Sequence, residues 1–212
     1  GQTIFHNPKL KITKQLGDGN LLSQLVNKTV VYDFRQADID NNGQGAPLTP
    51  IFHYLLVNKI ASAYEFELPI SILNIGGISN VSQIKSFSNE IENNLLAIDI
   101  GPGNCLIDEW IRKNSKLNFD EGGKIAKSGK VDQLILNQVI ENFEIKNYSK
   151  SLDTKDFDIS FARGLSLEDG CATITYFTAQ LISDAIKYLN NINFSKKYLL
   201  SGGGRKNDFL IN

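Results

Sequence analysis

The stretch LLAIDIGPGNCLIDEWIRK, residues 95–113, decides the fold of this chain. Its first six residues are apolar except for Asp99, and they predict a buried β-strand over residues 95–100. The turn GPGN, residues 101–104, follows, and a helix is expected over residues 105–113. A strand, a glycine loop and a helix in this order place backbone N–H groups and a helix N-terminus against an anion. The stretch therefore predicts an anion-binding turn at a strand end.

Two more glycine turns follow predicted strands, in NIGGISN at residues 74–80 and in LLSGGG at residues 199–204. Glycine allows positive φ and lets a backbone approach a ligand with no Cβ in the way. One such turn is a weak signal, because many glycine turns only reverse the chain. Three of them, with hydroxyl and amide side chains beside them, favour contacts to nucleotide phosphates and sugars. A binding module in which the turns serve only geometry stays an alternative.

The three turns lack the motifs of two other large nucleotide-binding classes. None of them shows the Rossmann pattern G-x-G-x-x-G opening a helix, and the chain has no Gly-Lys-Ser or Gly-Lys-Thr of a Walker loop. A dehydrogenase and a P-loop enzyme are therefore excluded.

The rest of the chain predicts alternating strands and helices. The connection at residues 76–80 suits a β-hairpin between strands at 70–75 and 81–87. Pro50 suits the first turn of a helix over residues 51–57. Further strands are expected at residues 29–32 and 197–200, and further helices at residues 21–26, 124–128, 131–142 and 166–189.

Composition and charge argue against several kinds of partner. The 22 Lys and Arg against 23 Asp and Glu leave a net charge of -1, which gives no long-range field to hold nucleic acid. The apolar stretches are too short to cross a bilayer, so no membrane partner is expected. Two cysteines without a signal peptide favour a reducing, cytoplasmic location. His6 and His53 have no nearby Cys or spaced His, so no metal-ligating residues are expected.

Asp99 is the acid singled out for chemistry. A carboxylate that ends a strand before a glycine loop can take a proton from a hydroxyl group or water while neighbouring N–H groups hold phosphate oxygens. The alternative is an Asx turn, in which Asp99 only hydrogen-bonds the following loop. A second polar cluster is Asp33, Arg35 and Asp38. It is either a surface salt bridge of little energetic value or a clamp in which the Arg35 guanidinium group grips an acid group.

A series of motifs runs through the chain. They are GQTIFH at residues 1–6, DFR at 33–35 with Asp38, GQGAPL at 43–48, LNIGGISN at 73–80, DIGPGN at 99–104 with Asp108 and Trp110, KSLD at 150–153 with Asp156 and Phe157, and GGG at 202–204 with Asn207. In these motifs and their order the chain resembles the anhydro-N-acetylmuramic acid kinases of bacterial cell-wall recycling. The resemblance covers nearly all of the chain, which makes it far more specific than one glycine turn.

The resemblance implies an α/β fold, a partial actin/hexokinase-like (ribonuclease H-like) two-lobed kinase with mixed sheets flanked by helices. Residues 1–60 would form the substrate-side part of the N-terminal lobe, and residues 61–212 a C-terminal lobe that is incomplete at its end. The implied enzyme is an ATP-dependent sugar kinase of peptidoglycan recycling. A carboxylate activates water, the 1,6-anhydro bond of 1,6-anhydro-N-acetylmuramic acid opens, and O6 takes the γ-phosphate to give N-acetylmuramic acid 6-phosphate. Mg2+ would bridge the ATP phosphates, and a homodimer is the expected assembly.

The resemblance also implies roles for individual residues. Asp99 matches the general base. The nucleotide would contact Gly76, Gly77, Ser79, Asn80, Gly101, Gly202, Gly203, Gly204 and Asn207, and the sugar would lie near Gln2, Arg35, Asp38, Gln44 and Gly45.

The chain also departs from the family pattern. The family's amino-terminal phosphate loop, a Ser-Gly-Thr-Ser stretch followed by Asp-Gly, is expected before Gly1, and more of the nucleotide lobe after Asn212. Where many members carry consecutive arginines after Asp-Phe, this chain has Arg35, Gln36 and Ala37. A non-catalytic remnant from a truncated or split gene therefore stays an alternative to an active kinase.

Overall fold

The chain divides into two compact units, Gly1–Phe52 and His53–Asn212. The computed structural model describes all residues except 1, 65, 89, 144–147 and 149–151, together with the side chains of residues 2, 62 and 92. The boundary between the units lies inside helix α3 (Thr49–Tyr64), which extends beyond the helix predicted over residues 51–57. The division predicted after residue 60 also lies inside this helix, and the roles assigned to the two parts stay predictions.

The first unit contains a two-stranded antiparallel sheet. Strand β1 (Gln2–Asn7) pairs with β2 (Ile12–Leu16) across the short helix η1 (Pro8–Leu10). Helices α1 (Gly19–Val26) and α2 (Phe34–Asp40) follow.

The prediction of a strand at residues 29–32 was wrong, because this segment is irregular. Its Val31 and Tyr32 are exposed, and among the described residues no strand pairs with the segment. β-propensity depends on packing against a neighbouring strand, which this segment does not have.

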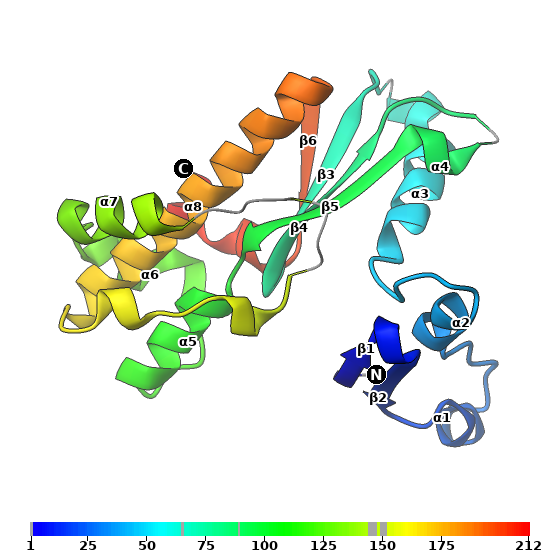
Figure 1. Cartoon of the computed structure of the whole chain (residues 1–212), viewed down its shortest axis with the longest axis horizontal. Coiled ribbons are helices and arrows are strands. Elements are labelled where there is room, and N and C mark those ends of the chain that lie inside the picture. Colours follow the sequence, from blue (N-terminus) through cyan, green and yellow to red (C-terminus); the bar gives the residue numbers. More distant parts are fainter. Residues whose placement is uncertain (1, 65, 89, 144–147, 149–151) are drawn as a thin grey trace. The chain divides into compact units, whose positions relative to one another are not determined.

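A four-stranded mixed sheet organises the second unit, with strand order β5-β4-β3-β6 (Figure 1). Strand β3 (Ile70–Ile75) pairs antiparallel with β4 (Ile78–Ile84) and parallel with β6 (Lys197–Ser201), and β4 pairs antiparallel with β5 (Leu95–Pro102). The predicted hairpin is thus confirmed. Its second strand begins at Ile78 rather than at residue 81, because the residues after the glycine pair already pair with β3.

Different helices cover the two faces of this sheet. Successive side chains of a strand point to opposite faces. Ile70 and Ile72 therefore lie on one face, where they pack with Tyr54 and Val57 of α3. The opposite face packs against the long helix α8 (Leu167–Ile192), and the buried cluster there is Leu73, Ile75, Val81, Ile100, Ile182, Ala185, Leu189 and Leu210. A mixed sheet flanked by helices confirms the predicted α/β class.

A cluster of helices extends the core beyond the sheet. Trp110 of α5 (Cys105–Asn114) packs on Gly170 of α8, where an added Cβ would lie 2.1 Å from the indole ring. Its Nε1 donates to the Leu167 carbonyl group at 2.9 Å. The remaining elements are α4 (Ile91–Asn94), η2 (Glu121–Gly123), α6 (Lys124–Ser128), α7 (Gln133–Asn142), η3 (Thr154–Asp156), η4 (Ser160–Ala162), η5 (Gly203–Lys206) and α9 (Asp208–Ile211).

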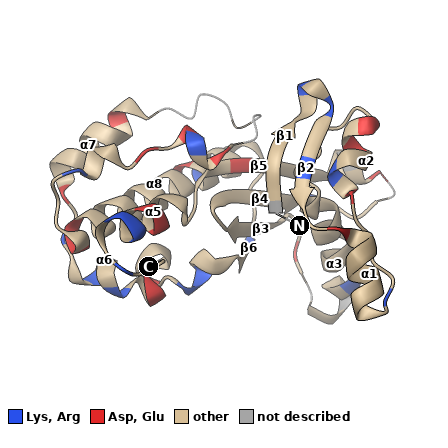
Figure 2. Cartoon of the chain, turned by 90° about the horizontal axis from the view of Figure 1, so that it is seen from below, with Lys and Arg blue, Asp and Glu red and all other residues tan. Residues whose placement is uncertain are grey.

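Both signs of charge are interspersed along the helices of the second unit (Figure 2). Among the described residues, none of the helices has the length and apolarity that a membrane span requires.

A buried polar network fixes the chain just before β6. Gln83 Nε2 donates to Ser195 Oγ at 2.7 Å, and the hydroxyl oxygens of Ser71 and Ser195 lie 2.6 Å apart. Gln83 and Ser71 are fully buried, so an unpaired polar atom here would cost free energy. Ser71 lies on β3 and Ser195 two residues before β6, so the network supports the register between these two strands.

We expect Ser195→Ala to lower the free energy of unfolding by about 1–3 kcal/mol, because it removes the bonds of the buried Ser71 and Gln83 side chains to Ser195 Oγ, while Gln83 Nε2 keeps its bond to Asn193 O. Ser128→Ala is the control, since Ser128 is an exposed serine whose hydroxyl group bonds the Ile125 carbonyl group. Urea-induced unfolding of both variants measures the difference. Equal changes in the two variants would show that the network adds no stability.

Candidate functional site

The three predicted glycine turns meet at one end of the mixed sheet. Two backbone hydrogen bonds join the second turn to the first: Gly103 N donates to Gly77 O at 2.8 Å, and Asn104 N donates to Gly76 O at 2.7 Å. The third turn approaches the first as well, because an added Cβ at Gly202 would lie 2.4 Å from Ile75 O. The structure therefore brings together turns that are far apart in sequence.

Internal packing explains some of these glycines. A Cβ at Gly103 would lie 2.2 Å from Gly76 O, and Gly202 has φ +80 in addition to its contact with Ile75. A Cβ at Gly204 would lie 2.2 Å from the Ile75 side chain. No side chain fits at these positions, so glycine is required by the fold itself.

Gly77 and Gly203 differ from the glycines required by packing. Among the described residues, a Cβ at Gly77 would have nothing within 4 Å, and at Gly203 it would meet only Asn104 Nδ2 at 3.6 Å. Neither residue has a positive φ in the range that disfavours side chains. Packing and backbone conformation therefore do not require glycine at these two positions. A glycine with open space above its backbone is expected where a ligand approaches closely.

A cavity of about 560 Å³ opens beside the turns. Asn104 and Gly203 connect it to them, and Asp108, one helical turn after Asn104 on α5, also lines it. Its volume lies within the range of about 300–1,000 Å³ usual for small-molecule sites. The other lining residues are Ile107, Arg112, Asn118, Phe119, Asp120, Glu121, Gly122, Lys206 and Asn207.

Asp99 lies on β5 opposite Asn80 of β4, half-buried. Its Oδ2 accepts a hydrogen bond from Leu152 N at 2.9 Å. Burial raises the pKa of the Asp99 carboxyl above its ordinary value, and the Leu152 N–H opposes this rise only in part. Asp99 is not among the residues that line the 560 Å³ cavity. Leu152 belongs to the KSLD motif, which lies partly outside the described residues, since residues 150 and 151 are not described.

The other predicted nucleotide residues take different places around the turns. Ser79 is fully buried and its hydroxyl group donates to Pro102 O at 3.2 Å, so it stabilises the second turn from β4. Gly101 is buried and pairs with Ser79 across the strands. Asn207 lines the cavity and caps α9, where its Oδ1 accepts from Leu210 N at 3.0 Å.

The predicted sugar residues belong to the first unit. Asp38 Oδ2 accepts a hydrogen bond from Gly45 N at 2.7 Å, which ties α2 to the glycine loop. Gly45 is buried with φ +69, and Gln44 beside it is exposed. Arg35 precedes Asp38 by three residues and so lies on the same side of α2. The side chain of Gln2 lies outside the described part of the structure.

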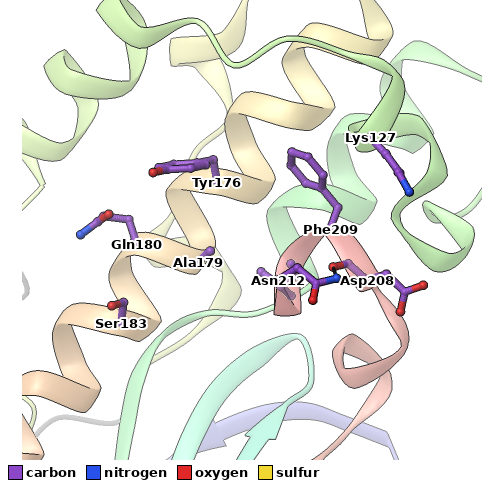
Figure 3. Close-up of a pocket in the computed structure, with 9 residues that line it drawn as sticks. Lys127, Tyr176, Ala179, Gln180, Ser183, Asp208, Phe209 and Asn212 are labelled. Carbon is purple, nitrogen blue, oxygen red and sulfur yellow. Dashed lines mark hydrogen bonds between the residues drawn. The ribbon is translucent and has the colours of Figure 1, made fainter.

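A separate apolar hollow of about 510 Å³ lies between α8 and α9 (Figure 3). Tyr176 and Gln180 of α8 border it on one side and Phe209 of α9 on the other, with Lys127 of α6 at its edge. None of the predicted site residues whose side chains the structure describes lines this hollow. It is therefore distinct from the candidate site.

Sequence reasoning assigned no role to Asn104 and Asp108, although both stand in quoted motifs. Their spacing of four residues directly after a glycine turn was the available signal, because it places them on one helix face. Phe119 and Lys206 carried no comparable signal, since only the tertiary fold brings them to the cavity.

The fold and the meeting turns define the class of protein: a mixed α/β protein whose strand ends gather three glycine turns beside the start of a helix. The sequence model of the family described as "Anhydro-N-acetylmuramic acid kinase" matches residues 1–212. The chain belongs to this family.

Curated relatives carry the same family name. The chain is 52% identical over 211 residues to a Pelagibacter ubique anhydro-N-acetylmuramic acid kinase, a match that covers 98% of this chain and 54% of the relative. It is 40% identical to a relative of that name from Methylobacterium nodulans, with 100% of this chain and 54% of that protein covered. The chain thus spans about half the length of these relatives.

One solved structure is similar in part of its fold: the activator of the 2-hydroxyisocaproyl-CoA dehydratase from Clostridium difficile with bound ADPNP. The TM-score is 0.39 at 17% identity, and the match covers 69% of this chain and 50% of that chain. A likeness of this size is too slight to support a conclusion about the site.

We expect Gly202→Ala to lower the free energy of unfolding by about 1–3 kcal/mol, because the new methyl group meets a carbonyl oxygen in a strained backbone conformation. Gly77→Ala should leave stability unchanged or raise it by about 0.4–1 kcal/mol, since its Cβ has open space. Thermal unfolding of both variants measures this. A large loss in Gly77→Ala would mean that this glycine serves packing after all.

Proposed function

We propose that the protein containing this chain is an ATP-dependent kinase for 1,6-anhydro-N-acetylmuramic acid. It hydrolyses the 1,6-anhydro bond and phosphorylates O6, giving N-acetylmuramic acid 6-phosphate in peptidoglycan recycling. Family membership over residues 1–212 supports the reaction, and the single structural observation that carries it is the meeting of three glycine turns at the start of α5. From the same resemblance we propose a cytoplasmic homodimer.

We propose that the ATP phosphates lie over Gly77 and Gly203. The space above these two residues supports this placement, because phosphate oxygens could approach backbone N–H groups there without meeting a side chain. The positive end of α5 favours the negative charge. Gly76, Gly101, Gly202 and Gly204 would shape the turns, Ser79 and Asn80 would support them from β4, and Asn207 would contact the nucleotide from the cavity.

Mg2+ would neutralise charge on the transferring phosphate when bound with ATP. Among the described residues, no group of three or more His, Cys, Asp or Glu gathers into a metal site. We propose that the ion would be held chiefly by phosphates and water, which is the usual manner of Mg2+ in kinases.

We propose Asp99 as the general base that takes a proton from the attacking water. A carboxyl whose pKa is raised by burial is a stronger base than a solvent-exposed one, so it suits proton abstraction. Its acceptor bond from Leu152 N leaves Oδ1 for a water molecule.

We propose that the sugar contacts residues of the first unit. Gln2 would bind sugar hydroxyl groups, and the Arg35 guanidinium group would pair with the carboxylate of the muramic acid. Asp38 holds the glycine loop by its bond to Gly45 N, so it would position Gln44 and Gly45 for sugar contact.

A non-catalytic remnant is the competing function. A chimera in which residues 1–212 replace the stretch that they match in the Pelagibacter ubique relative distinguishes the two. We expect phosphate transfer from ATP to the anhydro sugar by the chimera, measured as N-acetylmuramic acid 6-phosphate. ATP binding without product would favour the remnant.

In this chimera, Asp99→Asn should lower kcat by about 100-fold or more while ATP affinity stays within about threefold, because only the general base is lost. The amide that replaces the carboxylate still accepts from Leu152 N, so the fold is retained. In the unsubstituted chimera, kcat/KM should rise with pH through the raised pKa of Asp99, since only the ionised carboxylate accepts a proton.

Asp184→Asn is the matched control, because Asp184 forms an exposed ion pair with Lys187 on α8. It should leave kcat unchanged. If Asp99→Asn keeps near-normal turnover, the assignment of the general base to Asp99 is wrong.

Gly77→Ala and Gly203→Ala should each weaken ATP binding by about tenfold or more, because the methyl group occupies the space proposed for phosphate. Isothermal titration of ATP into the 212-residue chain and into the chimera measures this. Ser128→Ala is the control, because Ser128 is exposed on α6 and does not line the cavity. Unchanged ATP affinity in both site variants would place the phosphates elsewhere.

A further inference from the structure

The 560 Å³ cavity beside the glycine turns contains a carboxylate without an assigned task. Asp108 lines it and is half-buried. Burial raises the pKa of its carboxyl, and Arg112 one turn later on α5 opposes the rise by favouring the ionised form. Within the described part of the chain, neither a hydrogen bond nor a direct ion pair engages the Asp108 carboxylate oxygens.

The other acids of the cavity are already engaged or point to solvent. Asp120 is buried, and its two oxygens accept from Ile125 N at 2.8 Å and Ala126 N at 3.0 Å, which starts helix α6. Glu121 is exposed. Among the described acids that line the cavity, Asp108 is therefore the half-buried one whose carboxylate oxygens can still accept hydrogen bonds from a ligand.

The position of Asp108 relative to the glycine turns indicates which part of a nucleotide would donate hydrogen bonds to it. Asn104 joins the turns through its backbone bond to Gly76 O, and Asp108 N donates to Asn104 O at 2.8 Å one helical turn further on. One turn of helix rises about 5.4 Å. Asp108 and Gly203 line the same cavity, so a ribose next to phosphates that lie over Gly77 and Gly203 is within reach of Asp108.

The rest of the cavity suits a nucleoside. Ile107 and the ring of Phe119 form an apolar wall on which a nucleotide base can stack. The amide of Asn118 can form hydrogen bonds with the edge of that base. A carboxylate in the same space would repel phosphate groups, but it accepts well from hydroxyl groups.

We infer that the Asp108 carboxylate accepts hydrogen bonds from the ribose hydroxyl groups of the bound nucleotide, so that the chain selects ribonucleotides over 2′-deoxyribonucleotides. This inference rests on the proposed nucleotide site and assigns a specificity-determining residue within it. A site built to accept a hydroxyl group rejects the analogue that lacks it, because a buried acceptor is then left unpaired.

A thermodynamic cycle between Asp108 and the 2′-hydroxyl group tests it. Isothermal titration gives the affinities of ATP and 2′-deoxyATP, each with Mg2+, for the 212-residue chain, the chimera and their Asp108→Ala variants. The unsubstituted proteins should bind ATP at least about tenfold more tightly than 2′-deoxyATP, as expected for a hydrogen bond to a charged acceptor. In Asp108→Ala this preference should fall below about threefold, mainly through weaker ATP binding.

Two further variants separate specificity from folding. Glu109→Gln is the matched control, because Glu109 is the next residue of α5 but pairs with Lys113 and does not line the cavity. It should keep the full preference for ATP. Asp108→Asn keeps the size of the side chain, so it should retain the fold and a reduced preference even if Asp108→Ala is unstable.

The outcomes distinguish the two proposals. If ATP binds tightly and the preference for ATP over 2′-deoxyATP is the same in the unsubstituted proteins and in their Asp108 variants, the role of Asp108 is wrong. The proposed nucleotide site would then still hold. No binding of either nucleotide to the chain or the chimera would overturn the nucleotide site itself, and the inference with it.

Discussion

Two backbone hydrogen bonds between the first and second glycine turns are the constraint on which the site depends. The N–H groups of Gly103 and Asn104 donate to the carbonyl groups of Gly77 and Gly76, so backbone atoms hold the start of α5 against the hairpin, and Ser79 Oγ adds a bond to Pro102 O. The close approach requires glycine at 103, where a Cβ would meet Gly76 O at 2.2 Å. Because backbone atoms set most of this geometry, the Asp108 side chain remains available to a ligand, while Asn104 Nδ2 donates to Ile75 O at 3.4 Å. The bonds also place the positive end of α5 beside Gly76 and Gly77.

The sheet below supplies the rigidity that such a site needs. Strand β3 is hydrogen-bonded on both sides, to β4 and β6, and apolar clusters cover both of its faces. The third turn follows β6, so its position depends on the β3–β6 register. The buried Ser71, Gln83 and Ser195 network supports that register from the opposite end of the strands. A change there would shift Gly202 relative to Ile75, where the contact leaves no room for adjustment.

Local signals carried most of what the sequence could predict. The strand over 70–75 and the helix after residue 104 were predicted correctly, because apolar runs and glycine breaks act within a few residues. The strand predicted at 29–32 failed, because β-branched residues form a strand only where a partner strand exists. The bond from Leu152 to Asp99 joins residues 53 apart, and the cavity draws on α5, η2 and η5. Such contacts arise from tertiary packing, which leaves no periodic trace in the sequence.

Three carboxylates in the matched motifs differ in what holds them, and the difference separates their proposed roles. Asp38 accepts from Gly45 N, so its charge stabilises a loop of the first unit. Asp99 accepts from Leu152 N, yet burial outweighs that bond and raises the pKa of its carboxyl, which favours a base. Asp108 has no such backbone donor among the described residues and faces the cavity. A ribose hydroxyl group would supply the donor that the fold withholds, and a hydrogen bond to the ionised form offsets the cost of burying the charge. Burial distinguishes Asp99 from Asp38, since each accepts from one backbone N–H group. The lack of such a donor distinguishes Asp108, because a carboxylate that no described N–H group has paired keeps its acceptor capacity for a ligand.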